Sequence, residues 1–66
     1  MHVFVCVNFR RDEEPTILAV CLTVEKAKQA CEADFGRPLP WLSTNEGFEF
    51  YHHRECYLIR EQEVQE

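Results

Sequence analysis

The chain has 66 residues, of which 45% are hydrophobic and 29% are charged, and its formal net charge is −5. This length predicts a single domain, residues 1–66, whose core is small because so short a chain buries only ~60% of the surface that its unfolded form exposes. The negative charge disfavours nonspecific binding to nucleic-acid phosphates and favours docking to basic protein surfaces. The sequence has no apolar run long enough for a membrane span, and it opens without the basic segment and cleavage pattern of a signal peptide. We therefore expect a soluble, cytoplasmic protein.

Four cysteines are present, at Cys6, Cys21, Cys31 and Cys56. Thiols stay reduced in a cytoplasmic protein. Three of the four lie in apolar, periodic segments, where a free cysteine behaves as a small hydrophobic residue. We expect buried, reduced thiols. Two disulfides, which export would allow, and metal ligation stay open as alternatives.

Two apolar strands are predicted first. His2–Asn8 carries valines at every second position on one face and Phe4 and Cys6 on the other. Apolar residues on both faces are typical of a central strand. The polar residues 10–15 suit the turn of an antiparallel hairpin, and Thr16–Leu22 is again apolar on both faces.

A short amphipathic helix is predicted over Val24–Phe35. Thr23 is a favourable N-cap, Gly36 supplies a left-handed C-cap, and Pro38 cannot continue the helix. Apolar residues recur at helical spacing and predict the buried stripe, which consists of Val24, Ala27, Cys31 and Phe35.

Two or three strands follow the helix. Residues 39–43 form a short extended segment, Phe48–His52 alternates as a strand, and the final strand runs over Cys56–Val64 after a turn at His53–Glu55. The fold class is therefore α+β: a mostly antiparallel sheet of four to five strands with one helix packed on one face, in the order β-β-α-β-β(-β). The order of the strands within the sheet is not determined by these patterns.

The layout resembles a scattered class of small phage and bacterial proteins that have no assigned activity. The resemblance is carried by Ile17-Leu18-Ala19-Val20 in the second strand, by Thr23-Val24-Glu25-Lys26-Ala27 at the start of the helix, by Trp41 and by Tyr57-Leu58-Ile59. These pieces span most of the chain, and each is structural. The resemblance implies a fold and a phage or prophage-type origin, and it supplies no catalytic residues.

His52, His53 and Cys56 are the candidate metal ligands, because they lie close together around a predicted turn. A closed zinc site needs four ligands, and no second pair has the usual spacing. We favour the interpretation that the histidines are solvated and that Cys56 is a core thiol. A cysteine–histidine nucleophile at the same place would need an orienting group and a pocket. We therefore expect no enzyme activity and no cofactor.

Aromatic residues gather after the helix, at Trp41, Phe48, Phe50 and Tyr51. Such residues fill small cores and also anchor interfaces. Glu61 and Glu63 lie on one face of the closing strand and predict an acidic strip. These six residues are the candidate interaction residues.

The two-faced strands suggest a function. One helix of about twelve residues covers only one face of a sheet, so the other face needs the post-helix segment, a second copy of the chain, or a partner. The leading hypothesis is a noncatalytic protein-interaction module, a phage-type modulator that binds a basic host protein surface. The alternatives are a self-associating homodimeric domain and a small zinc-binding domain. Neither nucleic acid nor a membrane is expected as a direct partner.

Overall fold

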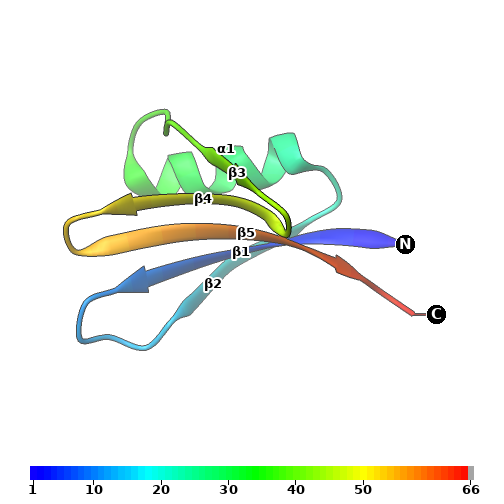
Figure 1. Ribbon diagram of the computed structural model, residues 1–66, viewed down its shortest axis with the longest axis horizontal. Coiled ribbons are helices and arrows are strands. Elements are labelled where there is room, and N and C mark those ends of the chain that lie inside the picture. Colours follow the sequence, from blue (N-terminus) through cyan, green and yellow to red (C-terminus); the bar gives the residue numbers. More distant parts are fainter. Residues whose placement is uncertain (66) are drawn as a thin grey trace.

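The computed structural model describes residues 1–65, and Glu66 lies outside the described residues (Figure 1). One helix, α1 (Val24–Phe35), accompanies a five-stranded sheet in the order β2-β1-β5-β4-β3. All four strand pairs are antiparallel, which confirms the predicted α+β class. The strands are β1 (His2–Arg10), β2 (Thr16–Cys21), β3 (Leu42–Thr44), β4 (Gly47–His52) and β5 (Glu55–Glu63).

The strand with two apolar faces, β1, lies inside the sheet between β2 and β5, as its pattern predicts. β2 is also apolar on both sides, yet it is an edge strand. A register shift in the β1–β2 ladder pairs Cys6 with Ala19 but Val7 with Ile17. This bulge leaves Leu18 without its own register partner, and both Leu18 and Ala19 pack against the core.

The helix has the boundaries and caps that the sequence predicts. Thr23 is the N-cap, and its Oγ1 accepts a hydrogen bond from the backbone N–H of Lys26 at 3.2 Å. Gly36 closes the helix with φ 97°, and its N–H donates to the carbonyl of Glu32 at 2.8 Å. A left-handed residue here satisfies a carbonyl of the last turn, which explains why the helix ends at a glycine.

The core lies between α1 and the sheet. Two helix residues of the predicted stripe, Ala27 and Cys31, are fully buried, whereas Val24 and Phe35 are half-buried. The sheet contributes residues from β1 and β5. Within residues 1–65, the buried apolar residues are Cys6, Ala27, Cys31, Leu39, Tyr57 and Ile59.

The segment after the helix is held against the helix by Glu32. The Oε2 atom of Glu32 accepts from the backbone N–H of Leu39 at 2.9 Å and from Nε1 of Trp41 at 3.2 Å. Leu39 is buried and Trp41 packs against the core. The post-helix segment therefore lies on the same side of the sheet as α1 and leaves the opposite side uncovered.

Candidate interaction surface

The face of the sheet opposite α1 is called the open face. Within residues 1–65, α1 is the only element that packs across the strands, and it contacts β1, β2 and β5. The alternation of β1 and the pairing registers define the open face on all five strands. Its members are Val3, Val5, Val7 and Phe9 of β1, Ile17 and Val20 of β2, Cys56, Leu58, Arg60 and Gln62 of β5, Gly47, Glu49 and Tyr51 of β4, and Leu42 and Thr44 of β3.

Large apolar side chains on the open face are strongly exposed. Ile17 is 65% exposed, Val20 60% and Tyr51 60%. Strands of nine, six, three, six and nine residues, at the usual rise and spacing, give the face an area of about 500 Å². This is the area of the whole face, polar residues included. An apolar patch of about 300–600 Å² is the largest that a typical monomer exposes, and it is often a functional surface.

The open face is electrically balanced, although the whole chain has a net charge of −5. Its two charged side chains are Glu49 on β4 and Arg60 on β5. Arg60 forms an exposed ion pair with Glu46 at 3.3 Å, and the hydroxyl of Tyr51 donates to Oε2 of Glu49 at 3.3 Å. The Glu49 carboxylate raises the pKa of Tyr51. Both charges lie near the surface, where such contacts exchange easily with water or with a new partner.

The aromatic candidates divide between the two sides of the sheet. Trp41, Phe48 and Phe50 are half-buried and pack against the core on the helix side. The ring centroid of Phe50 lies 5.7 Å from that of Phe35 on α1. Tyr51 alone belongs to the open face, because Cys56 is its register partner. The first three residues therefore complete the core.

Glu61 and Glu63 lie on the helix side of β5, since they pair with Phe4 and His2. Both are exposed, at the end of the molecule that also holds the two chain termini (Figure 1). Oε2 of Glu61 is 2.8 Å from Nδ1 of His2. Glu46 lies at the same end, and its carbonyl accepts from the N–H of Glu61 at 3.0 Å. The acidic strip is therefore an end of the molecule and is separate from the open face.

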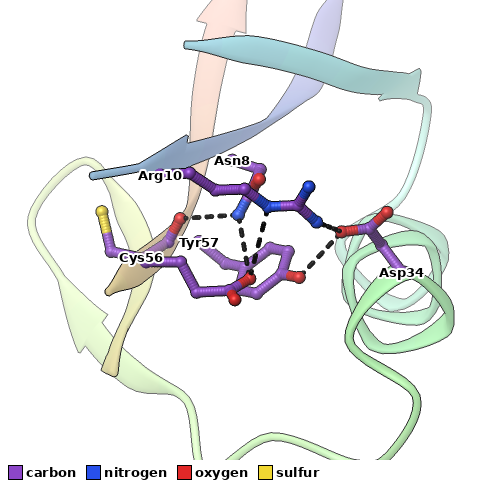
Figure 2. Close-up of polar contacts among 6 residues, drawn as sticks. Asn8, Arg10, Asp34, Cys56 and Tyr57 are labelled. Carbon is purple, nitrogen blue, oxygen red and sulfur yellow. Dashed lines mark hydrogen bonds and ion pairs between the residues drawn. The ribbon is translucent and has the colours of Figure 1, made fainter. Parts of the chain in front are cut away.

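Two of the three candidate metal ligands, His52 and Cys56, lie on opposite faces of the sheet, and the ring of His53 lies 4.9 Å from that of His52. His52 pairs with Glu55 and stacks near Phe50 on the helix side, whereas Cys56 pairs with Tyr51 on the open face. Figure 2 shows the sulfur of Cys56 directed away from α1. No group of three or more His, Cys, Asp or Glu side chains within residues 1–65 is arranged to hold a metal ion.

All four cysteines are free thiols. Cys6 and Cys31 are fully buried, and the Sγ of Cys6 donates to the carbonyl of Ala27 at 3.5 Å. A hydrogen bond with the Cys31 thiol, together with burial, raises the pKa of Cys6, and the same hydrogen bond lowers the pKa of Cys31. Burial also raises the pKa of Cys21 and of Cys56. Thiols with raised pKa values are weak nucleophiles at neutral pH.

A cluster of polar side chains joins the end of α1 to β1 and β5 (Figure 2). The hydroxyl of Tyr57 donates to Asp34 at 2.8 Å, and Arg10 lies 3.5 Å from the same carboxylate and 3.9 Å from that of Glu55. The amide of Asn8, which is almost fully buried, donates to Glu55 at 3.4 Å.

The contacts of this cluster make it a structural clamp. Asp34 lies in the last helical turn, where a negative charge opposes the helix dipole, and Arg10 and Tyr57 offset this. Burial and the hydrogen bond to Asp34 raise the pKa of Tyr57. Within residues 1–65, every buried side-chain nitrogen and oxygen has a hydrogen-bond partner, so the cluster presents no buried polar atom to a ligand.

The valines of β1 and the apolar residues of β2 are the site residues that sequence reasoning did not single out. Their alternation was visible, and it showed that both faces of β1 are apolar. Which of the two faces receives the helix depends on long-range packing. Only the three-dimensional arrangement assigns Val3, Val5 and Val7 to the open face.

Comparison with family models, curated proteins and solved structures finds no match to this chain. Among the described residues, no helix has the length and apolar character that crossing a membrane requires.

Proposed function

We propose that this chain is a noncatalytic protein-interaction module and that the open face is its docking surface. The observation that supports the proposal most directly is the uncovered apolar face, with Ile17, Val20 and Tyr51 each at least 60% exposed. Burying these side chains against a partner removes apolar surface from water and stabilises the complex. Three observations support a structural rather than a catalytic role for the remaining polar groups: the hydrogen-bonded clamp at the helix end, the raised pKa values of Cys6, Cys21 and Cys56, and the complete burial of Cys31.

The test compares matched variants in affinity capture from a lysate of the source cells. Val20→Lys places a charge on the open face, and Ala33→Lys places the same charge on the exposed side of α1. A captured protein is identified by mass spectrometry, purified, and titrated against each variant by calorimetry. We expect Val20→Lys to weaken binding at least tenfold and Ala33→Lys to leave it unchanged. Equal binding by both variants would refute the open face as the docking surface.

A second candidate surface is the acidic end formed by Glu46, Glu61 and Glu63. A backbone hydrogen bond joins Glu61 to Glu46 at this end of the sheet. Within residues 1–65, Glu61 pairs with His2 and Glu46 pairs with Arg60. We propose that this end selects a basic host protein, as a phage-type modulator would, in the cytoplasm, where the four free thiols stay reduced.

The acidic end is tested with the variant Glu61→Gln/Glu63→Gln. Its binding to the identified partner is compared with that of Glu13→Gln/Glu14→Gln, which removes the same charge from the exposed β1–β2 turn. Steering by the acidic end predicts slower association for the first variant only, with a smaller difference at high salt. The same loss in both variants would show that net charge alone matters.

A further inference from the structure

We propose that the occupant of the open face is a second copy of this chain, packed sheet to sheet about a two-fold axis. The inference rests on the proposed function, because it names the partner of the same docking surface. Three properties of the face support it: its area, its charge pattern and the position of the helix.

The area fits a dimer of modest affinity. About 500 Å² of sheet per copy gives roughly 1,000 Å² for two copies, which is at the lower end of specific interfaces. Two twisted sheets that pack face to face lie about 10 Å apart, and the side chains between them interdigitate. Val3, Val5 and Val7 form a continuous apolar row along β1, an interior strand beside the central strand β5, and this row supplies the apolar part of such a contact.

The charge pattern is self-complementary. Glu49 and Arg60 lie on neighbouring strands: Glu49 pairs with Leu58, and Arg60 with Gly47. A two-fold axis that passes between Glu49 and Arg60 brings the acid of one copy opposite the base of the other, and it does so twice in one interface. A partner of uniformly basic surface would leave Arg60 facing a like charge. The balanced face therefore favours a second copy over the basic protein proposed for the acidic end.

The helix does not obstruct this arrangement. α1 and the segment that contains Trp41 lie on the opposite side of the sheet, so they form the two outer layers of the dimer. Glu61 and Glu63 also lie on the helix side of β5, outside the face that is buried. Each copy therefore keeps Glu61 and Glu63 accessible in the dimer.

The test uses sedimentation of purified protein from about 1 µM to about 500 µM, which brackets a micromolar dissociation constant. The wild type is compared with Glu49→Arg, with Arg60→Glu, and with an equimolar mixture of the two variants. Each single change places like charges opposite each other across the two-fold axis. In the mixture, two arginines on one copy face two glutamates on the other.

We expect the wild type to dimerise, each single variant to weaken dimerisation at least tenfold, and the mixture to form a heterodimer. Either change also creates a repulsion within one chain: Arg60→Glu places a second acid beside Glu46, and Glu49→Arg places a second base on the strand next to Arg60. Mixing cannot relieve a repulsion within one chain, so recovery in the mixture reports a contact between copies. Ala33→Glu, which alters charge on the exposed side of α1, serves as the control and should dimerise like the wild type. Circular dichroism checks that each variant is folded.

Three results would overturn the inference: a wild-type monomer at every concentration, a dimer that neither charge reversal weakens, or single variants that mixing fails to restore. A dimer insensitive to both reversals would indicate pairing through the edge strand β2 instead. The proposed function is judged separately. A monomeric wild type that loses an identified partner on Val20→Lys retains the docking surface and excludes only the second copy.

Discussion

Gly36 and Gly47 both have positive φ, but their surroundings differ, so replacing each by alanine should destabilise the fold by different amounts. Gly36 has φ 97°, and an added Cβ there meets no atom within 4 Å. Gly47 has φ 150°, and an added Cβ would overlap the backbone oxygen of Ile59 and lie 2.9 Å from its carbonyl carbon. The first site therefore tests backbone conformation alone, whereas the second adds a collision with the neighbouring strand.

The expected losses of stability differ by a factor of two or more. Gly36→Ala should cost about 1 kcal/mol, the ordinary penalty of a left-handed residue with a side chain. Gly47→Ala carries a comparable or larger conformational penalty and must also separate the start of β4 from β5, because Ile59 offers only backbone at the contact. We expect a loss of about 3 kcal/mol. A domain of this size has only a few kcal/mol of stability in total, so the variant should be close to unfolding.

The assay is urea unfolding of both variants and the wild type, followed by circular dichroism and by the fluorescence of Trp41. Dilute protein keeps any self-association from contributing to the measured stability. Equal m-values would show that the same cooperative unit unfolds in each variant. The reasoning fails if Gly47→Ala is no more destabilising than Gly36→Ala, since the close approach of Ile59 would then have no energetic consequence.

Three further predictions follow from single contacts. Glu32→Ala should destabilise the fold by about 1–3 kcal/mol and shift the fluorescence emission of Trp41 to the red. Glu32→Gln should destabilise the fold less, because its amide oxygen still accepts a hydrogen bond. Equal losses of stability in calorimetry would contradict this. Tyr57→Phe should cost about 1–2 kcal/mol at neutral pH. Because the folded pKa of Tyr57 is raised, the wild type loses this advantage as pH rises above about 10, the ordinary pKa of the phenol; a gap between the two melting temperatures that widens with pH would be the opposite result. Cys6 and Cys31 should resist alkylation in native buffer and react fully in urea, and peptide mapping that finds either modified in native buffer would refute their burial.

The local features of the fold were predictable from the sequence, because they depend on neighbouring residues. The helix runs over Val24–Phe35 as expected, Thr23 caps it and Gly36 ends it. The strands lie within two residues of their expected ends at β1 and β2. In each case a short-range rule was sufficient. A side-chain oxygen accepts from a free N–H at the start of the helix, a glycine adopts the left-handed conformation at its end, and apolar residues at every second position predict a strand.

The order of the strands was not predictable, because it depends on contacts far apart in the chain. β1 pairs with β5, so His2 lies opposite Glu63 at the other end of the sequence. β2 is apolar on both faces, which is the pattern of an interior strand, yet it lies at the edge of the sheet. The bulge at Leu18 turns two successive residues toward the core, so the alternation along β2 did not reveal its position. The clamp of Asn8, Arg10 and Tyr57 also needs this long-range pairing, and no local motif indicates it.

The width of the helix explains where the aromatic residues lie and why the open face remains uncovered. An α-helix is about 10–12 Å across, whereas five strands span about 24 Å. α1 contacts β2, β1 and β5, so it reaches only part of the sheet. Phe48 and Phe50 on β4, together with Trp41 beside the helix, fill the remaining part of the same face. One layer thus uses most of the large aromatic side chains of the chain, and within residues 1–65 no segment is left to form a second layer. The apolar row of β1 therefore stays on the uncovered side, and it is on this row, beside Glu49 and Arg60, that we propose a second copy docks.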